Sequence, residues 1–99
     1  ARAAVTPEDF EEFFDYPNQS VRAAAAHNRN ATAEILHRFA DDKFWGVTVE
    51  LPLHANVTPE TLMYILELYD KNRGLVYGAS RDKLKEWGYP FDENGTLIR

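Results

Sequence analysis

One pattern of polar and apolar positions recurs along the chain and predicts the start of a helix each time. Its fullest form is residues 57–66, where an apolar residue precedes Thr58, Pro59 and Glu60, and apolar residues then follow at helical spacing. A threonine can cap a helix, a proline fits the first turn, and a carboxylate there opposes the positive end of the helix dipole. We therefore predict a helix that begins after Thr58 and buries one apolar stripe.

The same pattern follows Thr6 and Thr32, so that the three threonines lie 26 residues apart. A weaker copy begins at Ser80, 22 residues after Thr58. Repeats with periods of about 20 to 50 residues are typical of solenoids, in which each unit stacks on its neighbours. We predict an all-α fold, a short helical-repeat solenoid of three to four units with a period of about 26 residues. A bundle of amphipathic helices without a repeat is the alternative.

Shorter segments connect the capped helices. Ser20 is a candidate cap for residues 21–27, whose alanines favour a helix and allow neighbouring backbones to approach closely. Residues 47–53 alternate like a strand, but their place in the repeat favours a short α or 3-10 helix that is interrupted or ended by Pro52. We predict the helical form, with the strand as the alternative.

The repeat gives the chain a single domain. In its last part we expect a short helix over about residues 81–87 and a small hairpin around a turn at residues 92–95. We also expect the domain, residues 1–99, to be part of a longer protein. The approximate bounds of the units and of the C-terminal cap are 5–30, 31–56, 57–78 and 79–99.

Composition excludes several classes of function. No apolar stretch is long enough to cross a bilayer, so we expect no membrane insertion. The absence of cysteine excludes disulfides, thiolate metal sites and cysteine nucleophiles, and it leaves the redox compartment open, although we expect a cytoplasmic protein. The formal net charge of −5 weighs against unspecific attraction to nucleic-acid phosphates.

No group of residues has the pattern of a catalytic or metal site. Ser20 and Ser80 have no neighbouring base, and helix caps explain them better than nucleophiles do. His27 and His54 follow the short segments of successive units, so stacking can bring them together, yet no carboxylate stands at a consistent spacing to complete a metal site. We expect no catalysis, no cofactor and no metal.

Two pairs of residues are candidates for contact with a partner. Phe44 and Trp45 replace the polar residues 18–19 of the preceding unit, and they either pack beneath the adjoining helices or anchor a partner. Tyr64 and Leu68 lie four residues apart on a second face of their helix, which either the C-terminal segment or a partner covers. The candidate partner-binding residues are therefore Phe44, Trp45, Tyr64 and Leu68.

The units resemble those of the leucine-rich repeat variant proteins. Residues 21–28 are similar to that family's Val-Arg-x-Ala-x-Ala-x-Asn segment, and residues 32–40 and 58–66 are similar to its Thr-Pro-Glu-x-Leu-x-x-Leu-Ala segment. The resemblance covers about residues 5–87 and implies a right-handed solenoid in which α-helices alternate with short 3-10 helices. It also implies protein interaction rather than catalysis, because the family shares no catalytic motif. HEAT-type repeats, which are usually longer per unit, are a nearby alternative.

Two functions remain open. The first is a protein-interaction and scaffolding module, whose partner is another protein or a neighbouring domain of the same chain. The second is nucleic-acid binding by a helical-repeat scaffold, against which the acidic net charge weighs. The arginines that this second function would use are Arg22, Arg29, Arg38 and Arg73.

Overall fold

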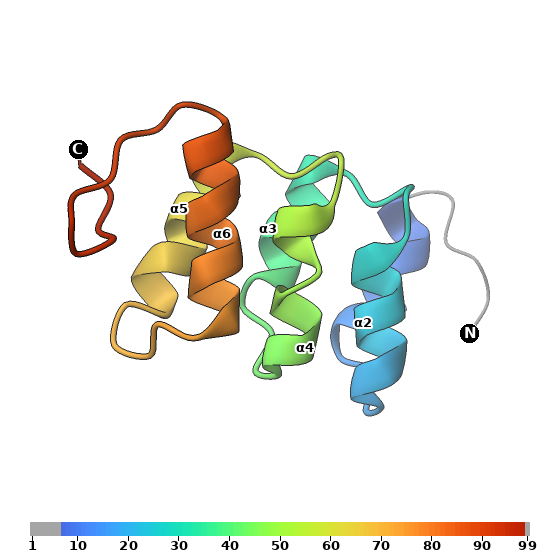
Figure 1. The fold of residues 1–99 in the computed structure, drawn as a ribbon. Coiled ribbons are helices and arrows are strands. Elements are labelled where there is room, and N and C mark those ends of the chain that lie inside the picture. The colour runs from blue at the N-terminus through green and yellow to red at the C-terminus, as the bar shows by residue number, and fades with distance from the viewer. Residues whose placement is uncertain (1–6, 99) are drawn as a thin grey trace.

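A computed structural model describes residues 7–98, which form an all-α fold (Figure 1). These residues form no strand, and their β-pairing is one isolated antiparallel bridge between Phe91 and Leu97. The helices, with η denoting a 3-10 helix, are η1 (Pro7–Phe10), α1 (Glu11–Phe14), α2 (Gln19–His27), α3 (Ala33–Phe39), α4 (Trp45–Thr48), η2 (Leu51–Leu53), α5 (Pro59–Leu68) and α6 (Leu75–Glu86).

The helices lie in two rows (Figure 1). Helices α2, α4 and α6 lie side by side in one row, and the chain returns between them through α3 and α5. The row behind consists of α1, α3 and α5. The structure extends over 44 × 23 × 15 Å, so that it is much longer than it is thick. The loops that connect the helices lie at the two ends of the helices (Figure 1).

The core lies between the two rows. Helix α3 contributes Leu36 and Phe39, and α5 contributes Leu62 and Ile65, which follow them by 26 residues; all four are buried. Burial of each such side chain contributes about 1.5–3 kcal/mol relative to exposure. The apolar stripe that the sequence predicts for each of these helices is therefore its buried face.

The predicted caps are confirmed for α3 and α5. The hydroxyl oxygens of Thr32 and Thr58 accept hydrogen bonds from the backbone N–H groups of Ile35 and Thr61, each over 3.3 Å. Such a cap is worth about 1 kcal/mol, because it satisfies an N–H group that has no partner in the first turn. The predicted cap at Thr6 lies outside the described residues.

The short segments are helical, as predicted. Residues 47–48 belong to α4 and residues 51–53 to η2, with a turn at residues 49–50 between them, so the strand alternative is wrong. The prediction that Pro52 interrupts or ends the helical segment is also wrong, because Pro52 lies within η2. The predicted cap of α2 is also wrong. Asn18, not Ser20, caps this helix, since its side-chain oxygen accepts from the N–H of Ser20 over 2.8 Å and the helix begins at Gln19. Asparagine caps a helix at least as well as serine does and comes two residues earlier.

The predicted start of the last helix is wrong. Helix α6 begins at Leu75 and runs without a break through Ser80, which is buried inside it rather than capping it. The reason is a buried face of the helix, because Val76, Ser80 and Leu84 follow one another by four residues and all three are buried. The predicted hairpin is present in minimal form, as the N–H of Gly95 donates to the carbonyl of Asp92 over 3.0 Å.

Candidate interaction surface

The most exposed tryptophan of the described chain lies beside an exposed leucine. Trp45, the first residue of α4, exposes 52% of its surface, and Leu75, the first residue of α6, exposes 65%. Both line one open pocket of about 140 Å³. The helices that they begin, α4 and α6, are neighbours in one row (Figure 1). We call this pocket the Trp45 pocket, and its lining residues are Trp45, Tyr69, Asn72, Gly74, Leu75 and Val76.

Phe44 and Trp45, which are consecutive where α4 begins, differ in burial. The ring of Phe44 is partly buried against the core, and its centroid lies 5.8 Å from that of Trp45. The N–H of Phe44 donates to Asp42 over 2.9 Å, and Arg22 binds the same carboxylate through Nε and Nη2 at 2.7 and 3.1 Å. The hydrogen bond to Asp42 raises the pKa of Arg22. Phe44 therefore packs beneath the adjoining helices, as the first interpretation expects, whereas Trp45 is exposed and remains a candidate anchor for a partner.

The second predicted pair does not join the Trp45 pocket. Tyr64 lies against α3, where its hydroxyl donates to Asp41 and its ring centroid is 5.2 Å from that of His37. The hydrogen bond to Asp41 raises the pKa of Tyr64. Tyr64 is therefore partly buried against α3 and the loop that follows it, and not against the C-terminal segment. Leu68 is exposed at the end of α5.

The four arginines do not form a free basic surface. Arg22, Arg38 and Arg73 each bind a carboxylate, with N–O distances of 2.7, 2.8 and 2.6 Å. Arg29 is exposed, and its side chain forms no ion pair with the residues that the structure describes. Charge that is neutralised within the protein contributes little to phosphate binding.

The histidines join successive turns of the chain and form no metal site. His54 donates from Nε2 to the carbonyl of Asn28 over 2.8 Å, because its Nδ1 accepts from the N–H of Asn56 over 3.0 Å. His27 and His37 each contact a polar side chain 23 or 24 residues away, at 2.9 and 2.8 Å. Within residues 7–98, no group of three or more potential ligands could hold a metal ion.

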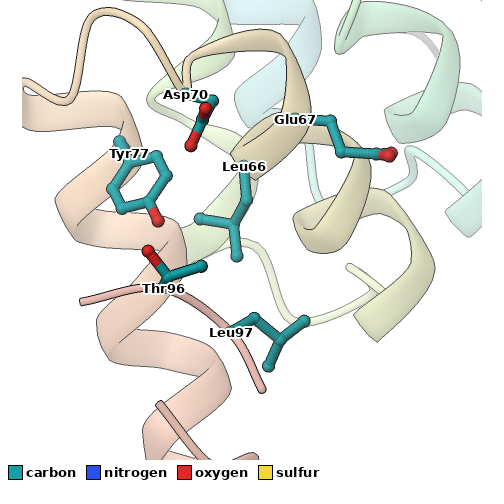
Figure 2. Close-up of a pocket in the computed structure, with 6 residues that line it drawn as sticks. All are labelled: Leu66, Glu67, Asp70, Tyr77, Thr96 and Leu97. Atoms are coloured by element: carbon teal, nitrogen blue, oxygen red, sulfur yellow. The ribbon is translucent and has the colours of Figure 1, made fainter. Parts of the chain in front are cut away.

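A second pocket, of about 220 Å³, lies where the C-terminal segment returns to α5 and α6 (Figure 2). The hydroxyl of Tyr77 donates to the carbonyl of Gly95 over 2.8 Å, and Arg73 donates to Thr96 over 2.9 Å. The C-terminal segment therefore already binds polar groups at this pocket. Its lining residues are Leu66, Glu67, Asp70, Tyr77, Thr96 and Leu97.

A third groove, of about 290 Å³, lies between residues 14–17 and 41–43, and its lining includes the ion pair of Arg22 and Asp42. Both this groove and the second pocket have polar side chains that are already bound within the protein. The Trp45 pocket differs from them, because two large apolar side chains at its edge are exposed and have no cover.

Leu75 is the site residue that the sequence analysis missed. Its position in the predicted repeat assigns it to a short segment that resembles the alanine-rich residues 21–27, for which burial is expected. The only local signal is that an apolar residue follows Gly74 directly, at the first position of a helix. That signal does not show that Trp45 lies beside it.

Comparison with protein-family models, with curated proteins and with solved structures finds no match for this chain. In the part of the chain that the structure describes, no helix has the length and apolar character needed to span a membrane. The geometry of the Trp45 pocket is therefore the basis on which we assign a function.

Proposed function

We propose that this domain is a protein-interaction module that binds another protein, or a neighbouring domain of the same chain, at the Trp45 pocket. The observation that carries the proposal is the pair of exposed side chains, Trp45 and Leu75, at the edge of one open pocket. Adjacent exposed apolar side chains mark interaction surfaces, and tryptophan is enriched among the residues that dominate binding energy. On this proposal the module performs no reaction of its own.

The architecture that we propose is a right-handed solenoid of the leucine-rich repeat variant type. The two caps at Thr32 and Thr58, 26 residues apart, support it, as does the equal burial of stripe residues at the same interval. Further support comes from Asn56, whose side-chain amide donates over 2.9 Å to the carbonyl of Ala31, the residue 25 positions before it. A stack of this kind holds its loops on a rigid scaffold, which suits a binding surface.

Selection of random linear peptides on the immobilised domain tests the proposal. Trp45→Ala serves for counter-selection, and Trp87→Ala is the matched control, because Trp87 is also exposed, at 40%, but lies outside the Trp45 pocket. We expect peptides whose affinity falls at least about tenfold with Trp45→Ala, as for a binding hot spot, and is unchanged with Trp87→Ala. If selection yields no peptide whose binding depends on Trp45, the proposal is wrong.

Nucleic-acid binding is the weaker alternative. Three of its four candidate arginines are held in ion pairs within the domain, and the formal net charge of the chain is −5. We expect no measurable binding to single- or double-stranded DNA in a fluorescence-anisotropy titration. An affinity that falls steeply as salt is added would favour this alternative instead.

A further inference from the structure

The C-terminal segment contains the single Asn-Gly pair of the chain, Asn94 and Gly95, in the turn at residues 92–95. Asn94 is exposed, and its side-chain amide forms no hydrogen bond with a residue that the structure describes. Gly95 has a φ of 78°, in the left-handed region that favours glycine, and it carries no Cβ. The backbone nitrogen of Gly95, which follows the Asn94 amide, therefore has no side chain of its own to hinder its approach to that amide.

Deamidation of asparagine at such a pair consumes only water. The backbone nitrogen of Gly95 gives up its proton and forms a bond to Cγ of Asn94. The bond between Cγ and the side-chain nitrogen breaks, and this nitrogen leaves as ammonia with the proton. Water then opens the resulting cyclic imide at either carbonyl group, which yields aspartate or isoaspartate. Nothing is oxidised or reduced, so the reaction requires no other reactant.

Native contacts hold the reacting peptide group on both sides. Its carbonyl, which belongs to Asn94, accepts a hydrogen bond from Arg73 over 3.0 Å. Its N–H, which belongs to Gly95, donates to the carbonyl of Asp92 over 3.0 Å. Tyr77 points from α6 toward the C-terminal segment and donates to the carbonyl of Gly95 over 2.8 Å (Figure 2). Attack on Cγ requires this planar group to turn and its N–H to leave its acceptor, so the turn must first open.

We propose that Asn94 is a site of spontaneous deamidation, and that the contacts of Arg73 and Tyr77 with the C-terminal segment set its rate. The rate follows the population of the open turn, because opening and closing are fast relative to the chemistry. Isoaspartate adds a carbon atom to the main chain within the turn, so the turn cannot keep the native spacing of these contacts. Formation of isoaspartate thus converts a reversible opening into a permanent release of the turn from α6.

Peptide mapping of the full chain by mass spectrometry, with enzymatic methylation to detect isoaspartate, measures the reaction. We expect both products at Asn94, at a rate that is at least about tenfold lower in the native protein than in urea. Tyr77→Phe removes one hydrogen bond of the turn and should raise the native rate about threefold. The matched control is Tyr69→Phe, which removes the hydroxyl that donates to Thr48 and should leave the rate unchanged.

A second pair of variants tests the arginine. Arg73→Ala removes the hydrogen bonds to Asn94 and Thr96 and should raise the native rate about tenfold. The matched control is Arg38→Ala, which breaks the exposed ion pair with Glu11 and should leave the rate unchanged.

The purified isoaspartyl protein tests the release. Its amide hydrogens at residues 92–98 should exchange faster than those of the Asn94→Asp variant, which carries the new charge without the longer main chain. Equal exchange in the two proteins would overturn the release. Absence of product at Asn94 in urea would overturn the modification site itself. Equal rates in native protein and in urea, or equal acceleration by the control variants, would overturn the role of Arg73 and Tyr77.

Discussion

Two helical glycines should respond in opposite directions to the same substitution. At Gly46, in α4, an added Cβ would lie 2.4 Å from Cε2 of Phe44 and 3.1 Å from two further atoms of that ring. At Gly78, in α6, the nearest atom would be Nη2 of Arg81 at 3.8 Å, which is an ordinary contact. Alanine therefore fits at Gly78 and collides with a rigid ring at Gly46.

The magnitudes follow from two opposing effects. Alanine stabilises a helix interior by about 0.5–1 kcal/mol relative to glycine, and we expect Gly78→Ala to raise the free energy of unfolding by this amount. At Gly46 the same gain is opposed by overpacking, which costs about 1–3 kcal/mol, because Phe44 packs against the core and cannot move freely. We expect Gly46→Ala to lower the free energy of unfolding by about 0.5–2 kcal/mol, or Tm by about 2–16 °C.

Urea and thermal unfolding, followed by circular dichroism, measure both changes. Phe44→Leu should relieve the collision, so the cost of Gly46→Ala should be smaller in that background than in the natural sequence. If Gly46→Ala stabilises the protein as much as Gly78→Ala does, the packing of Phe44 over α4 is wrong. Equal costs of Gly46→Ala in the two backgrounds would contradict the assignment of the effect to this ring.

Three further outcomes follow from the contacts. Arg22→Ala leaves the nearly buried carboxylate of Asp42 without its partner, so it should lower the free energy of unfolding, measured in urea, by about 2–3 kcal/mol. In an Asp42→Asn background, which lacks the buried charge, the same substitution should cost less. Asp41→Ala should lower the pKa of Tyr64, measured by NMR titration of its ring, since the hydrogen bond to Asp41 is the largest cause of the raised value. Trp45→Ala should change the free energy of unfolding by less than about 0.5 kcal/mol, as an exposed side chain outside the core does; a larger loss would mean that Trp45 holds the fold together.

The helices that begin after a capping threonine could be predicted from sequence because their signals are local. Thr32 and Thr58 combine a cap with an apolar stripe that starts within one turn, and both helices begin where expected. The start of α6 could not be predicted in this way. Ser80 has the local signature of a cap, but burial of Val76 and Leu84 on the same face extends the helix through it. Tertiary packing overrides a cap signal worth only about 1 kcal/mol.

The candidate site was predictable only in part. The departure of Phe44 and Trp45 from the repeat marks a segment that borders the Trp45 pocket, but the sequence does not say which side chain faces inward. The sequence also does not show that Tyr64 contacts Asp41 and the ring of His37, which leaves it partly buried. Leu75 was missed because its neighbour in the pocket comes from a distant part of the chain, and proximity of that kind is set by the packing of α4 beside α6.

The exposure of Trp45 follows from the packing of a very short helix. In α4, Val47 and Thr48 are buried, and Phe44 lies across Gly46, where a Cβ would leave no room for its ring. These residues fill the inward-facing side of the turn, so the helical geometry leaves Trp45 on the outside. The covered part of Trp45 packs beside the ring of Phe44, with 5.8 Å between the ring centroids. Its exposed part is the surface that the proposed function assigns to a partner.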